Sequence, residues 1–351
     1  MTQKTISCSL LAFALAGLSL APAPLVADSG PDQAALAERL GSLADAHTIE
    51  TDAQGHVVRF AVSNHQVHRP INDKTVLAQP GLTDDDLADL LQLRHLQAIF
   101  LEKQALSAAG YQQLTDLPAL EDVRIHYPGD RFVNRHHGLD PIDASFATLV
   151  DRLPHTLRQL ELKHGFDVQG EGGDVLAGLR PLPQLRKLEL DTAFATPGSV
   201  EFILGSPELE DLQLHRTTLS DADLQRVFAA LPKLRILELR PVANSGPDPI
   251  GAHSLRGLRE HQNLQRLYLS IAWGELGWED GLEHLATIPT LTLLSVAGTK
   301  PPVDPDGEAI RKLREALPDL SINFGKPEKN VTGSVPPNLS RDSETKWGIT
   351  K

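Results

Sequence analysis

Leucines recur along the chain at two spacings, and residues 209–239 show both of them. Leu212 and Leu214 alternate with polar residues, which predicts a strand with one apolar face. The next apolar residues are spaced by three and four, which predicts a one-sided helix that begins after Ser220, with Asp223 placed to complete a capping box. The apolar residues of this helix are Leu224, Val227, Phe228 and Leu231.

This strand–turn–helix unit is too small to bury its apolar residues alone, so it must stack on copies of itself. The pattern L-x-x-L-x-x-L-x-L recurs at 93–101, 117–125, 182–190, 231–239 and 288–296, with one extra residue at 153–162. Ser206 and His261 replace the first leucine in two further copies. The step from Ile99 to Val123 is 24 residues, whereas the step from Val123 to Leu160 is 37.

These copies resemble leucine-rich repeats over residues 54–324, most closely the bacterial pattern L-x-x-L-x-L-x-x-T-x-[LI]-[ST]-D-x-x-L, which residues 209–224 follow. The resemblance implies an α/β leucine-rich repeat solenoid, with a right-handed parallel β-sheet on the concave face and helices on the convex face. We divide the chain into a signal peptide (1–27), an N-terminal helix and capping strand (28–82), the repeat array (83–324) and a disordered tail (325–351).

The chain departs from the family where many members carry an asparagine that links neighbouring coils. Threonine replaces this side chain in part, but alanine and valine do not, so we expect looser turns. The positions concerned are Ala193, Thr217, Val242, Ala272 and Thr299.

The amino-terminal 27 residues have the layout of a secretory signal peptide. Lys4 is their only charge, residues 10–20 are apolar and too few for a comfortable membrane span, and small residues precede Asp28. An uncleaved anchor is the alternative. Cleavage would remove Cys8, the only cysteine, so the mature chain would have neither disulfide nor thiol nucleophile. We expect a periplasmic or secreted protein without membrane insertion of the mature chain.

Both ends of the array carry elements that can cap an open stack. Residues 29–47 predict a helix and 55–62 a first strand, while 308–317 and 320–324 predict a closing helix and strand. Thr83 and the three aspartates after it favour helix capping over calcium binding, because the alternating ligands and glycine of a calcium loop are missing.

Insertions interrupt the array, and the longest contains residues 127–141. His126, His136, His137 and Asp140 offer metal ligands there, but their spacing matches no standard motif, so a surface for partner contact is favoured. Glycines 170, 172 and 173 predict a flexible turn instead of a phosphate loop. The tryptophans at 273 and 278 fit either an exposed binding spot or packing over the coil edge, and packing is favoured.

The parallel strands should align their outward side chains in columns. The central column is Phe100, Arg124, Glu161, Glu189, Gln213, Glu238, Tyr268 and Ser295. The flanking columns are Glu102, His126, Lys163, Asp191, His215, Arg240, Ser270, Ala297 and Ala98, Asp122, Gln159, Lys187, Asp211, Ile236, Arg266, Leu293. Glu161 and Glu189 should repel each other unless Lys163 and Lys187 compensate.

From these columns we select the candidate binding residues Arg124, Glu161, Glu189, Asp191, Gln213, His215, Glu238, Arg240 and Tyr268. A solvated face without a ligand is the plain alternative. A pair of carboxylates acting as acid and base is another, but we expect an open sheet to desolvate them too little for that chemistry.

Composition narrows the function. A formal net charge of −13 disfavours nucleic acid and anionic membranes as partners. The sequence contains no H-E-x-x-H, no G-x-S-x-G and no cysteine cluster, so we expect no enzyme, cofactor or metal. The hypothesis is an exported, monomeric scaffold that binds a protein or peptide through the concave face and residues 127–141. The alternatives are a hydrolytic or metal-dependent site built from the insertions, or a structural envelope component.

Overall fold

The computed structural model describes residues 32–64, 81–128, 147–163, 176–191, 194–241, 252–271, 277–298 and 304–325. Contacts divide the chain into the units Met1–Pro31 and Asp32–Lys351, and all described residues belong to the second. The predicted signal peptide, the glycine-rich turn, Trp273, nearly all of residues 127–141 and the tail after Gly325 lie outside the described residues.

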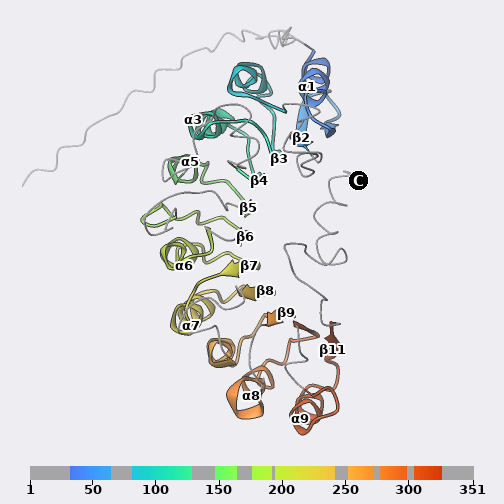
Figure 1. Cartoon of the computed structure of the whole chain (residues 1–351), viewed down its shortest axis with the longest axis vertical. Coiled ribbons are helices and arrows are strands. Elements are labelled where there is room, and N and C mark those ends of the chain that lie inside the picture. Colours follow the sequence, from blue (N-terminus) through green and yellow to red (C-terminus); the bar gives the residue numbers. More distant parts are fainter. Residues whose placement is uncertain are drawn as a thin grey trace, which may run out of the picture. The chain divides into compact units, whose positions relative to one another are not determined.

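The described residues form eleven strands in one sheet, and the strands follow one another in chain order (Figure 1). Neighbours from β2 to β11 pair in parallel, as the repeat predicts. The strands are β1 (Ala46–Thr51), β2 (Val57–Ser63), β3 (Ala98–Glu102), β4 (Asp122–His126), β5 (Gln159–Lys163), β6 (Lys187–Asp191), β7 (Asp211–Thr217), β8 (Ile236–Pro241), β9 (Arg266–Ile271), β10 (Leu293–Gly298) and β11 (Ser321–Phe324).

Strand β1 was not predicted, and it runs antiparallel to β2. The helix expected over residues 29–47 ends at Gly41, because the next turn lacks an apolar stripe and Thr48 and Ile49 are β-branched. The hairpin turn is held by Asp52, whose Oδ1 accepts hydrogen bonds from two backbone N–H groups, and by Gly55 at φ +86°. The amino-terminal end of the sheet is therefore a hairpin.

Short helical segments connect the strands and lie on one side of the sheet (Figure 1). Several begin or consist of a 3₁₀ turn, and one is a π turn, so these connections are less regular than the predicted amphipathic helices. They are α1 (Gln33–Gly41), η2 (Asp84–Asp86), α2 (Leu87–Leu90), α3 (Ala108–Gln113), η3 (Leu114–Asp116), α5 (Ala147–Arg152), η6 (Pro197–Ser199), α6 (Val200–Leu204), α7 (Asp221–Ala230), η7 (Ala252–Leu258), η8 (Trp278–Leu282), α8 (Glu283–Leu285) and α9 (Glu308–Ala316).

The repeat leucines form one continuous core between the sheet and these helices, as predicted. Both strand leucines of the founding unit, Leu212 and Leu214, are fully buried. Ser220 caps α7 as expected: its Oγ accepts from the backbone N–H of Asp223 at 3.2 Å, and Asp223 accepts from the backbone N–H of Ser220 at 3.2 Å. The capping interpretation at Thr83 is also confirmed, because its N–H and hydroxyl both donate to Asp86.

Of the five positions where this chain lacks the family's asparagine, only Thr217 lies among the described residues. Its hydroxyl donates to the backbone oxygen of Ala195 in the preceding coil at 2.9 Å and accepts from Leu219. Threonine therefore supplies the link between coils here. Trp278 packs against the core, half-buried, with the Lys312 ammonium 5.6 Å from its ring centre.

Repeated β–α units, a parallel sheet in chain order and a shared leucine core together define an α/β leucine-rich repeat solenoid. We call the side of β2–β11 that faces away from the helices the open face. It is the face that the sequence assigned to ligand binding.

Candidate binding face

The predicted columns of the open face are present in register. Each neighbouring pair of the central column, from Phe100 and Arg124 through to Tyr268 and Ser295, is a backbone partner pair. The register between β4 and β5 is kept even though 37 residues separate Val123 from Leu160. The face therefore presents a fixed grid of side chains.

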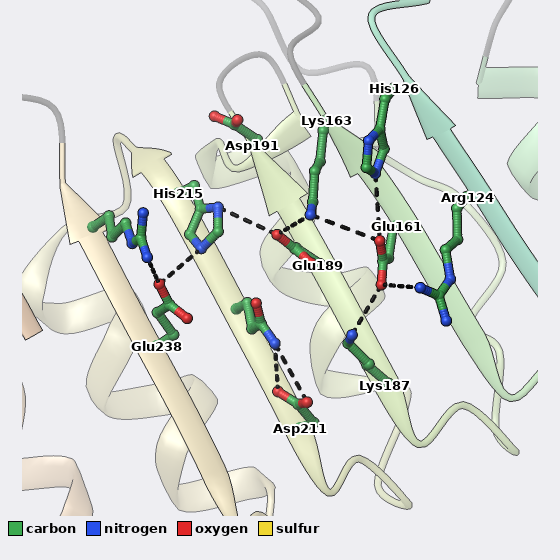
Figure 2. Close-up of polar contacts among 12 residues, drawn as sticks. Arg124, His126, Glu161, Lys163, Lys187, Glu189, Asp191, Asp211, His215 and Glu238 are labelled. Carbon is green, nitrogen blue, oxygen red and sulfur yellow. Dashed lines mark hydrogen bonds and ion pairs between the residues drawn. The ribbon is translucent and has the colours of Figure 1, made fainter. Parts of the chain in front are cut away.

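Glu161 is the centre of a charged network that extends over the five strands β4–β8 (Figure 2). Its side chain is fully buried, and the ammonium of Lys187 donates to it at 2.9 Å. The Gln159 amide donates to the same oxygen at 2.7 Å. Arg124 at 3.5 Å and Lys163 at 3.7 Å complete the cationic surroundings. A buried carboxylate needs such partners, because an unpaired charge in this position would be strongly destabilising.

These contacts decide the protonation of the network. Burial alone would raise the pKa of Glu161, but Lys163, a hydrogen bond from His126, Lys187 and Arg124 together hold this pKa well below its usual range. Burial alone would lower the pKa of Lys163, but Glu189 and Glu161 raise it instead. Both groups are therefore charged at neutral pH.

Lys163 continues the network to β6, where its ammonium lies 2.7 Å from the Glu189 carboxylate. His215 on β7 then lies between two carboxylates. Its Nδ1 is 3.3 Å from Glu189 and its Nε2 is 3.3 Å from Glu238, which also pairs with Arg240 (Figure 2). The alternation of cations and anions confirms the prediction that lysines offset the repulsion between Glu161 and Glu189.

Two carboxyl groups at the β7–β8 end differ in their ionisation. Burial would raise the pKa of Glu238, but its hydrogen bond and charge interaction with His215, together with Arg240, lower this pKa to about 2. Burial raises the pKa of Asp211 to about 6, and only Lys187 and the Gln213 amide oppose this shift. Asp211 is thus the least compensated carboxyl group of the network.

Asp191 lies at the end of β6 and is nearly fully buried. It accepts two hydrogen bonds from the guanidinium of Arg216, whose backbone has a positive φ of +47°. Lys103 and Tyr127, which follow β3 and β4, have the same left-handed conformation with φ of +55°. A left-handed residue thus directly follows β3 and β4, and another lies one residue before the end of β7, where Arg216 bonds Asp191.

The alternative of a solvated face is wrong for the charges at the centre of the open face. The side chains of Glu161, Glu189 and Arg124 are 0%, 2% and 3% exposed. The expectation of little desolvation was also wrong, since burial is the largest influence on every carboxyl pKa described above. The alternation pattern of a strand does not show that long charged side chains on neighbouring strands cover one another, as Arg124, Lys187 and Glu161 do here.

All nine candidate binding residues lie on β4–β9, and all project to the open face. Gln213, Arg240, His215 and Tyr268 keep partial exposure, whereas the others are buried. The candidate set lacks the bridging Lys163, Lys187 and His126, although the two lysines already stood beside Glu161 and Glu189 in the predicted columns. The candidate set also lacks Arg216. Its contact with Asp191 depends on a local bulge after His215, and the sequence pattern does not predict this bulge.

The open face changes character toward both of its ends. Near the amino-terminal end, Ala61, Ala98 and Phe100 form a small apolar cluster, and the Phe100 ring packs edge-on against His126 at 4.7 Å. On β8–β10 the side chains of Ile236, Tyr268 and Leu293 are half-buried, and Arg266 is exposed. The face is therefore apolar, then charged, then mixed.

The described part of the chain contains no group of three histidine, cysteine or acidic side chains arranged to hold a metal ion. His126 donates to Glu161, and the other proposed metal ligands at 136, 137 and 140 lie outside the described residues. Among the described helices, none combines the length and apolarity needed to cross a bilayer.

Comparison with known proteins gives no match to a protein-family model and none to a curated sequence. Solved structures do show likeness. The Rad7–Elc1 complex in yeast is 18% identical, with 75% of this chain and 73% of that chain covered and a TM-score of 0.46. An internalin, InlF, from Listeria monocytogenes is 16% identical, with 84% and 76% covered and a TM-score of 0.41.

The third structure is a TLR13–ssRNA13 complex, which is 15% identical, with 76% of this chain and 34% of that chain covered and a TM-score of 0.43. At these values the assignment of the architecture rests on the strand order and register of the chain itself.

Proposed function

We propose that this protein is an exported, non-catalytic scaffold that binds a protein or peptide ligand through its open face. The observation that carries the proposal is the pre-organised grid: parallel strands hold the outward side chains in register, and the charged network fixes their rotamers before a ligand arrives. A surface that is already ordered loses less conformational entropy on binding.

The same network speaks against acid–base catalysis. A general acid and base need a carboxyl group that exchanges protons near the working pH. Asp211, with a pKa of about 6, meets this condition, but Glu161 and Glu238 are held ionised by several cations each and are therefore poor proton acceptors beside it. The acidic net charge of the chain disfavours nucleic acid and anionic membranes as ligands.

Binding by the open face is tested with replacements that block it without removing a buried charge. Gln213→Arg and Ser295→Arg each add a long side chain at a half-buried position of the central column. Ala229→Arg adds the same side chain at an exposed position on α7 and is the control. The probe is a display library of random twelve-residue peptides selected on the full chain.

We expect the library to enrich a peptide family whose affinity falls at least tenfold with either blocking replacement and stays unchanged with Ala229→Arg. Failure to enrich any peptide, or equal binding to all variants, would reject the open face as the binding surface. The thermal midpoints of all variants should agree within a few degrees, which excludes unfolding as the cause of lost binding.

Export is part of the proposal and is supported by the charge and apolarity of residues 1–27. The bacterial variety of repeat followed by residues 209–224 points the same way, to the periplasm or the medium, and the scaffold would act as a monomer. Residues 1–30 fused to a phosphatase that is active only outside the cytoplasm should give active enzyme in a bacterial host, and inactive enzyme would reject export.

A further inference from the structure

Arg266 on β9 differs from the other charged side chains of the open face. Every other charged side chain that the described strands β2–β10 turn to this face has a polar partner. The Arg266 side chain is exposed, and none of the described residues pairs with its guanidinium. A cation without a partner on an otherwise compensated surface is available to a ligand.

Arg266 is flanked by apolar side chains on both neighbouring strands. In the backbone register Arg266 lies between Ile236 on β8 and Leu293 on β10, and both of these side chains are half-buried. Tyr268 projects to the same face two residues further along β9. Arginine and tyrosine among aliphatic side chains are typical of the residues that contribute most to protein interfaces.

The carboxylates near Arg266 are already engaged. Glu238, the backbone partner of Tyr268, pairs with Arg240 and lies 3.3 Å from His215. Asp211, one strand beyond Ile236, accepts hydrogen bonds from Gln213. Within the part of the chain that the structure describes, no carboxylate is therefore left to pair with this guanidinium.

We propose that Ile236, Arg266 and Leu293 form a docking spot for one acidic side chain of a protein ligand, with apolar residues on both sides of that acid. The planar guanidinium binds a carboxylate through two parallel hydrogen bonds. Ile236 and Leu293 lie on strands spaced by about 4.8 Å on either side of Arg266, so they contact the residues that flank the acid and exclude water.

The net charge of −13 limits the acidity of the partner. A tract of acidic residues would be repelled by the protein as a whole, whereas one carboxylate within an apolar segment meets a local positive charge. The inference rests on the proposed function, since it names the part of the open face that contacts the ligand and the chemistry recognised there.

The test uses the peptides enriched on the full chain from the random library described above. We expect the enriched sequences to share a Glu or Asp with an apolar residue within about four positions on each side. Affinity should fall at least tenfold for Arg266→Gln and by a similar factor when the peptide acid is replaced by its amide. The two changes together should lose little more than either alone, because both remove one contact.

Arg256→Gln is the matched control, since Arg256 is an exposed arginine on η7, on the helical side of the sheet. It should leave affinity unchanged. Arg266→Gln removes no side-chain hydrogen bond or ion pair within the described residues, so its thermal midpoint should match that of the unchanged protein.

Three outcomes would overturn the inference. If affinity falls with Gln213→Arg or Ser295→Arg but not with Arg266→Gln, the open face binds ligands elsewhere and only this assignment fails. If amidating the peptide carboxyl terminus removes binding while the internal acid is dispensable, the ligand is a chain terminus. If no variant of the open face affects binding, the proposed function fails as well.

Discussion

His261 shows how a single polar residue can take the place of a repeat leucine. It stands at the position of Leu231 in the preceding coil, is 8% exposed, and its Nε2 donates to the backbone oxygen of that leucine at 2.9 Å. Its Nδ1 accepts from the backbone N–H groups of Asn263 and Leu264. The ring therefore fills the leucine volume and satisfies three backbone groups at once.

We expect His261→Ala to lower the free energy of unfolding by about 2–3 kcal/mol, because it leaves a cavity and removes the acceptor of the Asn263 and Leu264 N–H groups. His261→Leu should recover most of this loss. In the preceding coil the Leu234 N–H donates to the backbone oxygen of Leu231. With leucine at position 261, the Leu264 N–H can make the equivalent hydrogen bond to the backbone oxygen of residue 261. Urea denaturation of both variants measures the difference, and equal losses would show that packing is not the main contribution.

Asp211 offers a test of the desolvation of the open face. Its folded pKa of about 6 lies above its ordinary value, so the folded state keeps the proton longer than the unfolded state. Stability is therefore lost as pH rises from about 4 to about 6, and the loss persists above that range.

Asp211→Asn removes this titration while its side chain can still bond Gln213. We expect the variant to be more stable than the unchanged protein by about 1–2 kcal/mol at pH 7.5, and equally stable at pH 3.5. Urea midpoints at the two pH values check this. A variant that is less stable at pH 7.5 would mean that the attraction of Lys187 outweighs the cost of burial.

At the scale of the element, the sequence predicted those parts whose signal is local. The L-x-L alternation located β3–β10, and the register of the columns followed from it, because a period of two residues leaves no freedom once one face is buried. The capping box of α7 was equally local. These are the same features that fix the place of the nine candidate residues.

Other elements depended on contacts that no local pattern contains. Strand β1 is recognisable only through its pairing with β2, and its half-exposed residues give no clear alternation. The burial of Glu161 results from side chains of its own strand and of the two neighbouring strands. The availability of Arg266 results from the absence of a partner among the described residues of its neighbours. Columns could be predicted from sequence, but the pairing within them could not.

Helix α7 is stabilised at its amino-terminal end by the Ser220 cap. Ser220→Ala removes the side chain that accepts from the Asp223 N–H, which should cost about 1 kcal/mol of unfolding free energy. Thr218→Ala, at a nearby exposed position before the helix, should change stability by less than about 0.5 kcal/mol. Chemical denaturation of the two variants separates them, and equal effects would contradict the role of the cap.

At the scale of the whole molecule, the network makes stability depend on pH in two opposite ways. Glu238 has a folded pKa of about 2, below its ordinary value, and that of Glu161 is lowered as well. Their contribution is complete above about pH 4.5 and is lost as pH falls toward 2. Asp211 acts in the other direction, between about pH 4 and 6.

We therefore expect maximal stability near pH 4–5, below the neutral range in which acidic proteins are usually handled. Thermal midpoints recorded from pH 2.5 to 8 at low protein concentration measure the profile. Asp211→Asn should flatten the neutral side of the maximum and leave the acid side unchanged. A profile that rises steadily to pH 8 would contradict the assigned ionisation of the network.

The left-handed residues at Lys103, Tyr127 and Arg216 have a consequence for how such a chain can diversify. Lys103 and Tyr127 directly follow the strands β3 and β4, whereas Arg216 lies inside β7, one residue before its end. The 37-residue step that follows Val123 shows that added length after a strand does not disturb the grid. Insertions after a strand can therefore vary in length and sequence while the register of the sheet stays the same. New surface loops can be added in this way without a change to the sheet or its core.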